Sequence, residues 1–290
     1  MRLNPFDTSK IKVRSSGGGR RVPGGRAGGM GCGTIVIVLI GVFVFDVDPG
    51  QMLGTIEGVQ QQSAPQSQQA GLSEEEACSI NEYASEACAA LQSLNETWAP
   101  IFQNARVPFE QPTLDLFRNG RVTTNGCGSA TSAAGPFYCP ADMGIYIDTS
   151  FYDQMAQQMG AEGDFARLYV MAHEYGHHIQ NLTGLATQIR SLQQQNPSES
   201  NALQVRMELQ ADCYAGVWAG LNRSRIERGD MEEGLRAASA IGDDTLMRNA
   251  GQRINPEGFT HGTSQQRMEA LQRGIQSADD TACDVYFDFR

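Results

Sequence analysis

The chain has 290 residues, enough for one large domain and an appendage. It carries 22 Lys/Arg and 33 Asp/Glu, and the charge is unevenly divided: the first 45 residues are +6, whereas the remainder, with 15 basic and 32 acidic residues, is −17. A region this acidic is a poor match for nucleic acid, whose phosphates attract the opposite charge, so we exclude nucleic acid as a partner.

The basic first part of the chain predicts disorder followed by a membrane anchor. Residues 1–28 are rich in glycine and lack hydrophobic periodicity, so we expect a disordered cytoplasmic segment. Residues 29–46 contain the run TIVIVLIGVFVF, and their length approaches the roughly 20 residues that cross a membrane. Basic residues precede the run and Asp46 ends it. This bias predicts a single-pass protein of the inner (cytoplasmic) membrane, with a cytoplasmic N-terminus and an extracytoplasmic remainder.

Two other interpretations of residues 29–46 compete with the anchor. A cleaved signal peptide would carry small residues at a cleavage site, and the following VFVFDVD offers none. A buried core strand is the second alternative, and the apolar composition alone does not exclude it.

The rest of the chain divides into a linker and one folded domain. Residues 47–72 are rich in Gln, Ser and Gly, which is typical of a flexible tether. The domain, residues 73–290, begins with Ser73 and Glu76 in a capping-box pattern. Apolar residues at helical spacing then predict one long scaffold helix to about Asn104.

Residues 113–148 have the pattern of short strands. LDLF, Asn119-Gly120 and RVTT predict a hairpin, and GSATSAAGPFYCP predicts a loop. Ile145–Asp148 predicts a further strand. This strand is either an ordinary core strand or, if it is exposed near a metal site, a partner for an extended peptide substrate.

The stretch 165–182 is the most informative part of the chain. Its apolar residues recur at helical spacing, and Gly184 follows as a C-terminal stop. Within this helix His173 and His177 are four residues apart, so both imidazoles face the same side and can bind one metal ion. Glu174 projects about 100° away, where it can contact a water bound to the metal.

A second helix, beginning near Ser198 or Ser200, offers a third ligand. Catalytic zinc takes three protein ligands and a water. Glu208 and Asp212 are again four residues apart beside an apolar stripe, where unpaired acids would be costly to bury. We assign Glu208 to the zinc and Asp212 to the free N–H of His173. The alternatives are exchanged roles for the two acids or a solvated acidic face.

The C-terminal region predicts two more helices. One begins with Asp230 and Glu233 in a capping-box pattern, and residues 243–260 are irregular. The last helix begins after Thr263, with Gln266 three residues on.

Three polar side chains near these helices are candidates for supporting roles. His261, in the loop before the last helix, can donate to the oxyanion of a tetrahedral intermediate; a satisfied loop or capping histidine is the alternative. Arg267 could orient His261 or bind a substrate carbonyl. His178 adjoins His177 but points off the metal face, so we interpret it as structural or as a support for the ligands.

The cysteines predict disulfides. Cys32 lies in the N-terminal segment, and the other six are Cys78, Cys88, Cys127, Cys139, Cys213 and Cys283. An even set suggests disulfides in an exported domain. Pairing of neighbours predicts 78–88, 127–139 and 213–283, although spacing does not determine connectivity. Free thiols in a cytosolic protein are the alternative. No CxxC or CxxH spacing occurs, which argues against a cysteine zinc site.

The motifs HEYGHHIQ, ELQADCYAG and HGTSQQR, in this order, resemble the neutral zinc metallopeptidase family of bacterial membrane-anchored proteins, and the resemblance covers nearly the whole chain. That family belongs with the gluzincins. With the predicted elements, it implies an α+β, predominantly α-helical, zincin-like domain with a small sheet after one N-terminal transmembrane helix. It also implies that His173, His177 and Glu208 bind Zn²⁺ and that Glu174 is catalytic. The order also resembles membrane proteases with HExxH, ExxxD and a late His/Arg, but this chain lacks their several spans.

We therefore expect a membrane-anchored zinc endopeptidase. Glu174 would act as general base and His261 would stabilise the oxyanion. The expected partners are a peptide or protein substrate and, through the anchor, the membrane. The alternatives are a zinc-binding envelope scaffold or chaperone without proteolytic activity, and a helical structural domain with a coincidental HExxH.

Overall fold

The computed structural model describes residues 1–16, 72–118 and 120–287. Its central sheet has four strands in the order β1 (Lys12–Ser15), β2 (Thr113–Phe117), β6 (Gly144–Asp148) and β5 (Phe137–Cys139). The first three strands are parallel, and β5 is antiparallel to β6. Val13, Leu114 and Ile145 are register partners in adjacent strands and are buried together in the main core.

Strand pairing differs from the hairpin predicted in the sequence. β3 (Arg121–Thr123) pairs with β4 (Ser129–Thr131) in a separate antiparallel sheet. β2 instead lies inside the parallel sheet, so the predicted hairpin is wrong, and the predicted loop contains β4 and β5. The strand predicted at Ile145–Asp148 is confirmed as β6. It pairs on both sides, however, so the edges of the sheet belong to β1 and β5.

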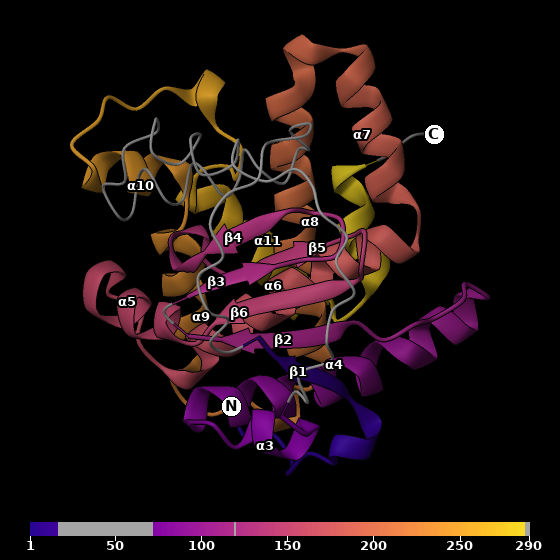
Figure 1. The fold of residues 1–290 in the computed structure, drawn as a ribbon. Helices are drawn as coiled ribbons and strands as arrows, with labels where there is room; N and C mark the ends of the chain where they lie inside the picture. The colour runs from indigo at the N-terminus through magenta and orange to yellow at the C-terminus, as the bar shows by residue number, and fades with distance from the viewer. Residues whose placement is uncertain (17–71, 119, 288–290) are drawn as a thin grey trace, which may run out of the picture.

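Helices pack mainly behind the sheet in the view of Figure 1. The α-helices of the described residues are α3 (Glu74–Cys78), α4 (Glu82–Ala105), α5 (Ser150–Met159), α6 (Asp164–Leu182), α7 (Leu185–Gln195), α8 (Ser200–Leu221), α9 (Asp230–Ala240), α10 (Asp243–Asn249) and α11 (Ser264–Ser277). α8 packs along both α6 and α11, and these three helices carry the candidate site. The α+β, predominantly helical class is therefore confirmed.

The long helix predicted at the start of the domain is two helices. The capping box of Ser73 and Glu76 is confirmed, but α3 ends within two turns. Asn81 then begins α4, because its side chain accepts a hydrogen bond from the amide of Ala84. A local cap therefore interrupts a pattern whose apolar spacing continues across the break.

The predicted C-terminal helices are present, with one wrong cap. Asp230 is the first residue of α9, not its cap, and its carboxylate accepts from the amide of Glu227. The region 243–260 is not wholly irregular, because it begins with α10. The capping box at the start of α11 is confirmed.

The first sixteen residues, here called the N-terminal arm, belong to the folded domain. Met1, Ile11 and Val13 are buried in the main core, and β1 forms an edge of the sheet. The predicted disorder is therefore wrong for residues 1–16. The arm contains too few apolar residues for periodicity to reveal it, and its pairing partner lies about a hundred residues away.

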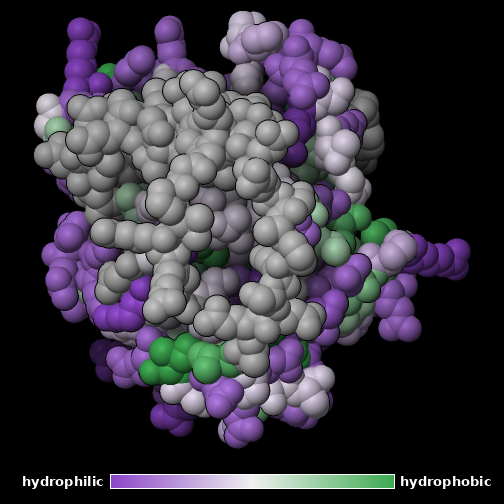
Figure 2. All heavy atoms as spheres, viewed as in Figure 1, coloured by the Kyte–Doolittle hydropathy of each residue, from purple (hydrophilic) through white to green (hydrophobic). Residues whose placement is uncertain are grey.

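Other N-terminal predictions fall on residues that the structure does not describe. These are the rest of the basic segment, the anchor at 29–46 and the linker up to residue 71. Among the described residues, no helix combines the length and the apolar character needed to cross a membrane. On the face shown in Figure 2 the described surface is mostly hydrophilic, with small apolar patches.

All three predicted disulfides are confirmed: Cys78–Cys88 joins α3 to α4, Cys127–Cys139 links the turn between β3 and β4 to β5, and Cys213–Cys283 ties α8 to the C-terminal 3-10 turn Asp280–Tyr286. The last of these fixes the helix that carries Glu208 and Asp212.

Candidate metal centre

Three predicted ligands meet between α6 and α8. α6 presents His173 and His177 on one side, and α8 presents Glu208, which is 3% exposed. Oε2 of Glu208 lies 3.1 Å from Nε2 of His173 and 3.5 Å from Nε2 of His177. One ligand atom from each residue lies within 4.8 Å of the others, so the three can share one ion.

The donor set and its spacing fit zinc. Tetrahedral zinc with bonds of about 2.0–2.1 Å separates neighbouring ligand atoms by roughly 3.4 Å. The distances of 3.1 and 3.5 Å from Glu208 match that separation. Two imidazoles and one carboxylate are also a ligand set of catalytic zinc, in which a fourth position stays open.

Close contact between two helices makes this geometry possible. Gly176, inside the HEYGH motif, lies against α8, where an added Cβ would be 2.8 Å from Cα of Ala211. Any side chain at this position would push α8 away. Because Glu208 precedes Ala211 by less than one turn, the small residue at 176 sets the distance between the third ligand and the two histidines.

Hydrogen bonds orient both imidazoles. Nδ1 of His173 lies 2.7 Å from Oδ1 of Asp212, as predicted, and Nδ1 of His177 lies 2.9 Å from Oε1 of Gln180. Both acceptors require Nδ1 to carry the hydrogen, which leaves each Nε2 lone pair free for a metal. Gln180 is itself held, because its amide donates to the carbonyl of Met207.

Asp212 is the centre of a buried network. Its carboxylate, 0% exposed, accepts from Tyr169 Oη at 2.6 Å and from Arg267 at 2.9 and 3.0 Å, in addition to His173. Arg267 also donates to Tyr169. The two roles considered for Arg267, orienting His261 or binding a substrate carbonyl, do not match this position. Arg267 instead holds the carboxylate that orients His173.

Glu174 lies within the same charged group. It is 8% exposed, and burial raises the pKa of its carboxyl against the opposing effect of His173 and His177. The pKa of Glu208 moves the other way: burial would raise it, but imidazoles protonated on Nε2, the form they take when a proton stands in place of a metal ion, outweigh burial through their charges and hydrogen bonds and hold it well below its ordinary value. The two carboxylates therefore differ in character, as a base and a ligand should.

His261 is held by an acid that the sequence analysis did not identify. Nδ1 of His261 lies 3.1 Å from Oδ1 of Asp243, whose other oxygen accepts from the backbone amides of Thr260, His261 and Gly262. Gly262 packs against Val205 of α8, which places this loop beside Glu208. Nε2 of His261 is buried without a hydrogen-bond partner among the described residues.

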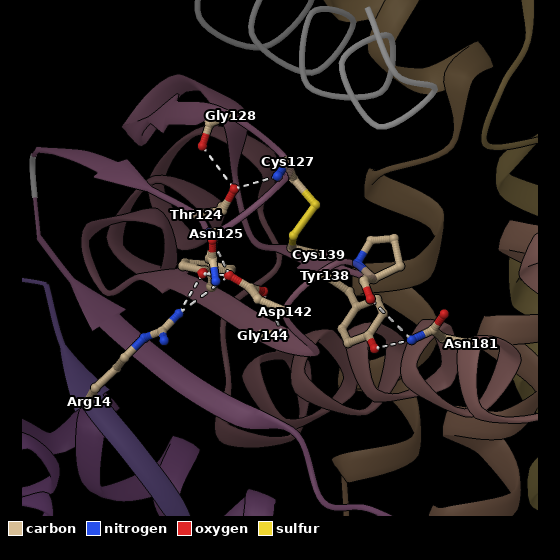
Figure 3. Close-up of a disulfide and its surroundings, with 12 residues drawn as sticks. Arg14, Thr124, Asn125, Cys127, Gly128, Tyr138, Cys139, Asp142, Gly144 and Asn181 are labelled. Carbon is tan, nitrogen blue, oxygen red and sulfur yellow. Dashed lines mark hydrogen bonds and ion pairs between the residues drawn. A yellow bond between two sulfur atoms is a disulfide. The ribbon is translucent and has the colours of Figure 1, made fainter. Parts of the chain in front are cut away.

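His178 has a structural role on the opposite side of α6. Its Nε2 donates to the carbonyl of Glu110 at 2.7 Å, and Tyr138 donates to its Nδ1 at 3.0 Å. Asn181 in turn donates to Tyr138, and Figure 3 shows these two side chains pointing toward one another between β5 and α6. His178 therefore fixes the edge strand to the metal helix.

Three residues that support the site were not predicted from the sequence: Tyr169, Gln180 and Asp243. Helical spacing could have revealed the first two, because they lie four residues before His173 and three after His177 on the same helix. Asp243 gave no such signal, because it contacts His261 across 18 residues of chain that include an irregular loop.

A second acidic group does not resemble the first. Asp164, Asp230 and Glu233 also lie close enough together to share an ion. The amino group of Met1 lies 2.9 Å from both Asp164 and Asp230, so a cation of the chain itself already contacts them.

Comparison with known proteins agrees with this site. The chain is 42% identical to the uncharacterized protein YpfJ of Escherichia coli (strain K12) over 291 residues, covering 97% of this chain and 96% of the relative. It is 39% identical to the uncharacterized protein Rv2575 of Mycobacterium tuberculosis (strain H37Rv) over 207 residues, 67% of each chain. No solved structure matches. The model of the family described as "putative neutral zinc metallopeptidase" matches residues 7–286, and the chain belongs to that family.

Proposed function

We propose that this protein is a zinc-dependent endopeptidase that acts on a peptide or protein substrate. The observation that carries the proposal is the convergence of His173, His177 and Glu208 beside the buried Glu174. Structural zinc sites are closed by four protein ligands. The group found among the described residues has three, which supports a site with one position left for reaction.

The zinc ligands and Glu174 have separate roles in the proposed reaction. A zinc ion held by the three ligands supplies a Lewis acid that polarises a carbonyl and lowers the pKa of a water. Glu174 removes a proton from the attacking water and later gives it to the leaving nitrogen. Its raised pKa supports this double role, because the carboxyl can hold the proton between the two steps.

His261 would stabilise the negative oxygen that forms on the substrate. When both ring nitrogens carry hydrogen, Nδ1 donates to Asp243 and Nε2 is left to donate elsewhere. A buried donor without a partner in the described residues is what an oxyanion site requires before substrate binds.

We also propose that the domain works outside the cytoplasm, attached to the inner (cytoplasmic) membrane through residues 29–46. The three disulfides support this location, because such bonds persist in oxidising compartments. The apolar composition of 29–46 supports the attachment.

The direct test combines zinc content with cleavage of a diverse peptide library by the full-length protein. We expect the wild type to bind zinc and cleave, and Glu174→Gln to keep zinc while cleavage falls by about 10²–10⁴-fold. His177→Ala should lose zinc. Glu162→Gln, an exposed glutamate just before α6, is the matched control and should behave as wild type.

Three results would change the proposal. Wild-type protein without zinc would refute it altogether. Zinc binding without any cleavage would favour a zinc-binding scaffold or chaperone of the envelope. Full activity in Glu174→Gln would show that another group is the base.

A further inference from the structure

The N-terminal arm is integrated into the domain through its apolar residues. Met1, Ile11 and Val13 are each at most 6% exposed and belong to the same core as α4 and α6. β1 pairs with β2 over four residues in register, from Lys12 with Thr113 to Ser15 with Leu116. The arm is therefore a strand of the central sheet and part of the core, not a tail lying on the surface.

Among the described residues, one buried acid of the domain has its ion pair and its side-chain hydrogen bonds with the arm. Asp115 sits between two leucines in β2 and is 1% exposed. Arg14 donates to it at 2.6 Å, and Ser16 donates through both its amide and its hydroxyl. These are the partners that the described residues provide for this carboxylate. A buried carboxylate without them would be strongly unfavourable, so β2 is built to receive the arm.

The same arginine reaches a second strand. Arg14 donates to the hydroxyl of Tyr146 on β6 and lies 3.7 Å from Asp142. Figure 3 shows Arg14 extending from β1 toward Asp142, beside the loop closed by Cys127–Cys139. Asp142 also accepts from the amide of Asn125, in the turn between β3 and β4. The arm is thus bonded to parts of the domain that follow it by more than a hundred residues.

These contacts constrain how the chain is placed relative to a membrane. The hydrocarbon core of a bilayer is about 30 Å thick, and hydrogen bonds and strand pairing cannot act across it. A single crossing between residues 16 and 72 would put the arm and the domain on opposite sides. We infer that the N-terminal arm and the domain occupy the same compartment. This differs from the cytoplasmic N-terminus expected from the charge bias. It requires residues 29–46 to hold the domain at the membrane without a single crossing, and it is independent of the proposed peptidase activity.

The test is a cross-link in intact cells expressing the full chain. Lys12→Cys with Thr113→Cys places two thiols on register partners of β1 and β2. Arg121→Cys with Thr131→Cys, partners in β3 and β4, is the matched pair within the domain. Both carry Cys32→Ser, which removes the cysteine outside the three disulfides. A short, membrane-permeant bismaleimide links adjacent thiols in any compartment, and mass spectrometry detects the joined tryptic peptides 11–14 and 107–118.

The expected result is a linked arm peptide in a yield comparable with the link within the domain. A link within the domain alone would overturn the inference. Single variants provide a second measurement that does not require pairing: Lys12→Cys in the arm and Glu162→Cys on the domain surface are treated with a membrane-impermeant maleimide in sealed vesicles. Labelling of both in vesicles of the same orientation supports a shared compartment, and labelling in opposite orientations refutes it.

Discussion

At the scale of single residues, the two histidine ligands are supported by different chemistry. His173 donates to a buried carboxylate, Asp212, which Arg267 neutralises, whereas His177 donates to the neutral amide of Gln180. A carboxylate acceptor makes an imidazole a stronger donor to a metal, and an amide mainly fixes its orientation. His173 is therefore the stronger electron donor to a metal, whereas the hydrogen bond of His177 mainly fixes the orientation of its ring.

Gln180→Met should weaken zinc binding by about 10–100-fold, because His177 would lose the acceptor that holds its ring and tautomer. Zinc affinity is measured by competition with a chelator. Gln193→Met is the matched control, since Gln193 is also a buried glutamine, on α7, outside the metal centre. If both variants lost zinc affinity equally, the effect would come from general destabilisation and not from His177.

The buried His178 should make the fold sensitive to acid. Burial lowers the pKa of His178 from 6.5 to about 4, so the unfolded chain takes up a proton at a higher pH than the folded one. The contribution of neutral His178 to the free energy of unfolding is therefore complete above pH 6.5. It is lost as the pH falls toward 4, a change of roughly 3 kcal/mol. Urea denaturation of chelator-treated wild type and His178→Gln measures it. As the pH falls, the wild type should lose stability relative to His178→Gln. A stability difference that does not change with pH would contradict the lowered pKa of His178.

At the scale of elements, glycines let the three site helices approach almost backbone to backbone. A Cβ at Gly216 would lie 2.1 Å from the carbonyl oxygen of Leu271, and one at Gly274 would lie 2.0 Å from that of Cys213. These contacts join α8 to α11 and bring Arg267 to Asp212, while Gly176 joins α6 to α8. The packing of the helices therefore sets the distances in the metal centre.

Gly176→Ala should be destabilising although alanine is the better helix former. Helix propensity favours the substitution by about 1 kcal/mol, but the new methyl would meet backbone atoms of Ala211 at 2.8 and 2.9 Å. We expect a net loss of about 1–3 kcal/mol and weaker zinc binding, measured by thermal unfolding and chelator competition. Gly258→Ala, whose methyl meets nothing closer than 3.4 Å, is the control. An increase in stability with unchanged zinc affinity would show that α8 can move away from α6 without an energetic cost.

The sequence predicted the helices of the site better than the sheet. The 3.6-residue period and the caps identify α6, α8 and α11 because both signals are local. β4 and β5 have only three residues each, too few for an alternation, and the partner of β2 is a distant strand. The ligand set could likewise be predicted from i, i+4 spacing, whereas Asp243 could not, because only the folded loop brings it to His261.

At the scale of the whole molecule, the domain is completed by a segment separated from it in sequence. Residues 1–16 supply one edge of the sheet, and residues 72–287 supply the rest of the described fold. Composition had assigned this segment to disorder, since its charge and glycine content are averaged with those of the residues that follow it. Asp115 is the one charged residue within the strand TLDLF, and a single acid in a buried strand indicates that a basic side chain pairs with it.

Arg14→Met should destabilise the domain by about 2 kcal/mol, less than for a fully buried pair because the arginine is partly exposed. It would leave Asp115 buried without its cation. Adding Asp115→Leu should restore most of the loss, since the apolar pair no longer needs a charge. Arg118→Met, which breaks the exposed pair with Asp153, should have little effect in urea denaturation. Equal losses in the two single variants, without rescue, would argue against a special role for the arm.

The distance in sequence between β1 and β2 also imposes an order in time. Arg14 and Asp115 are 101 residues apart, so at about 5–20 residues per second the ribosome needs roughly 5–20 s to make the partner after the arm. During that interval the arm has nothing to pair with, and when β2 is complete its edge stays open until the arm returns. Docking of the arm therefore cannot begin until β2 has been made, and the edge of β2 stays open until the two strands meet.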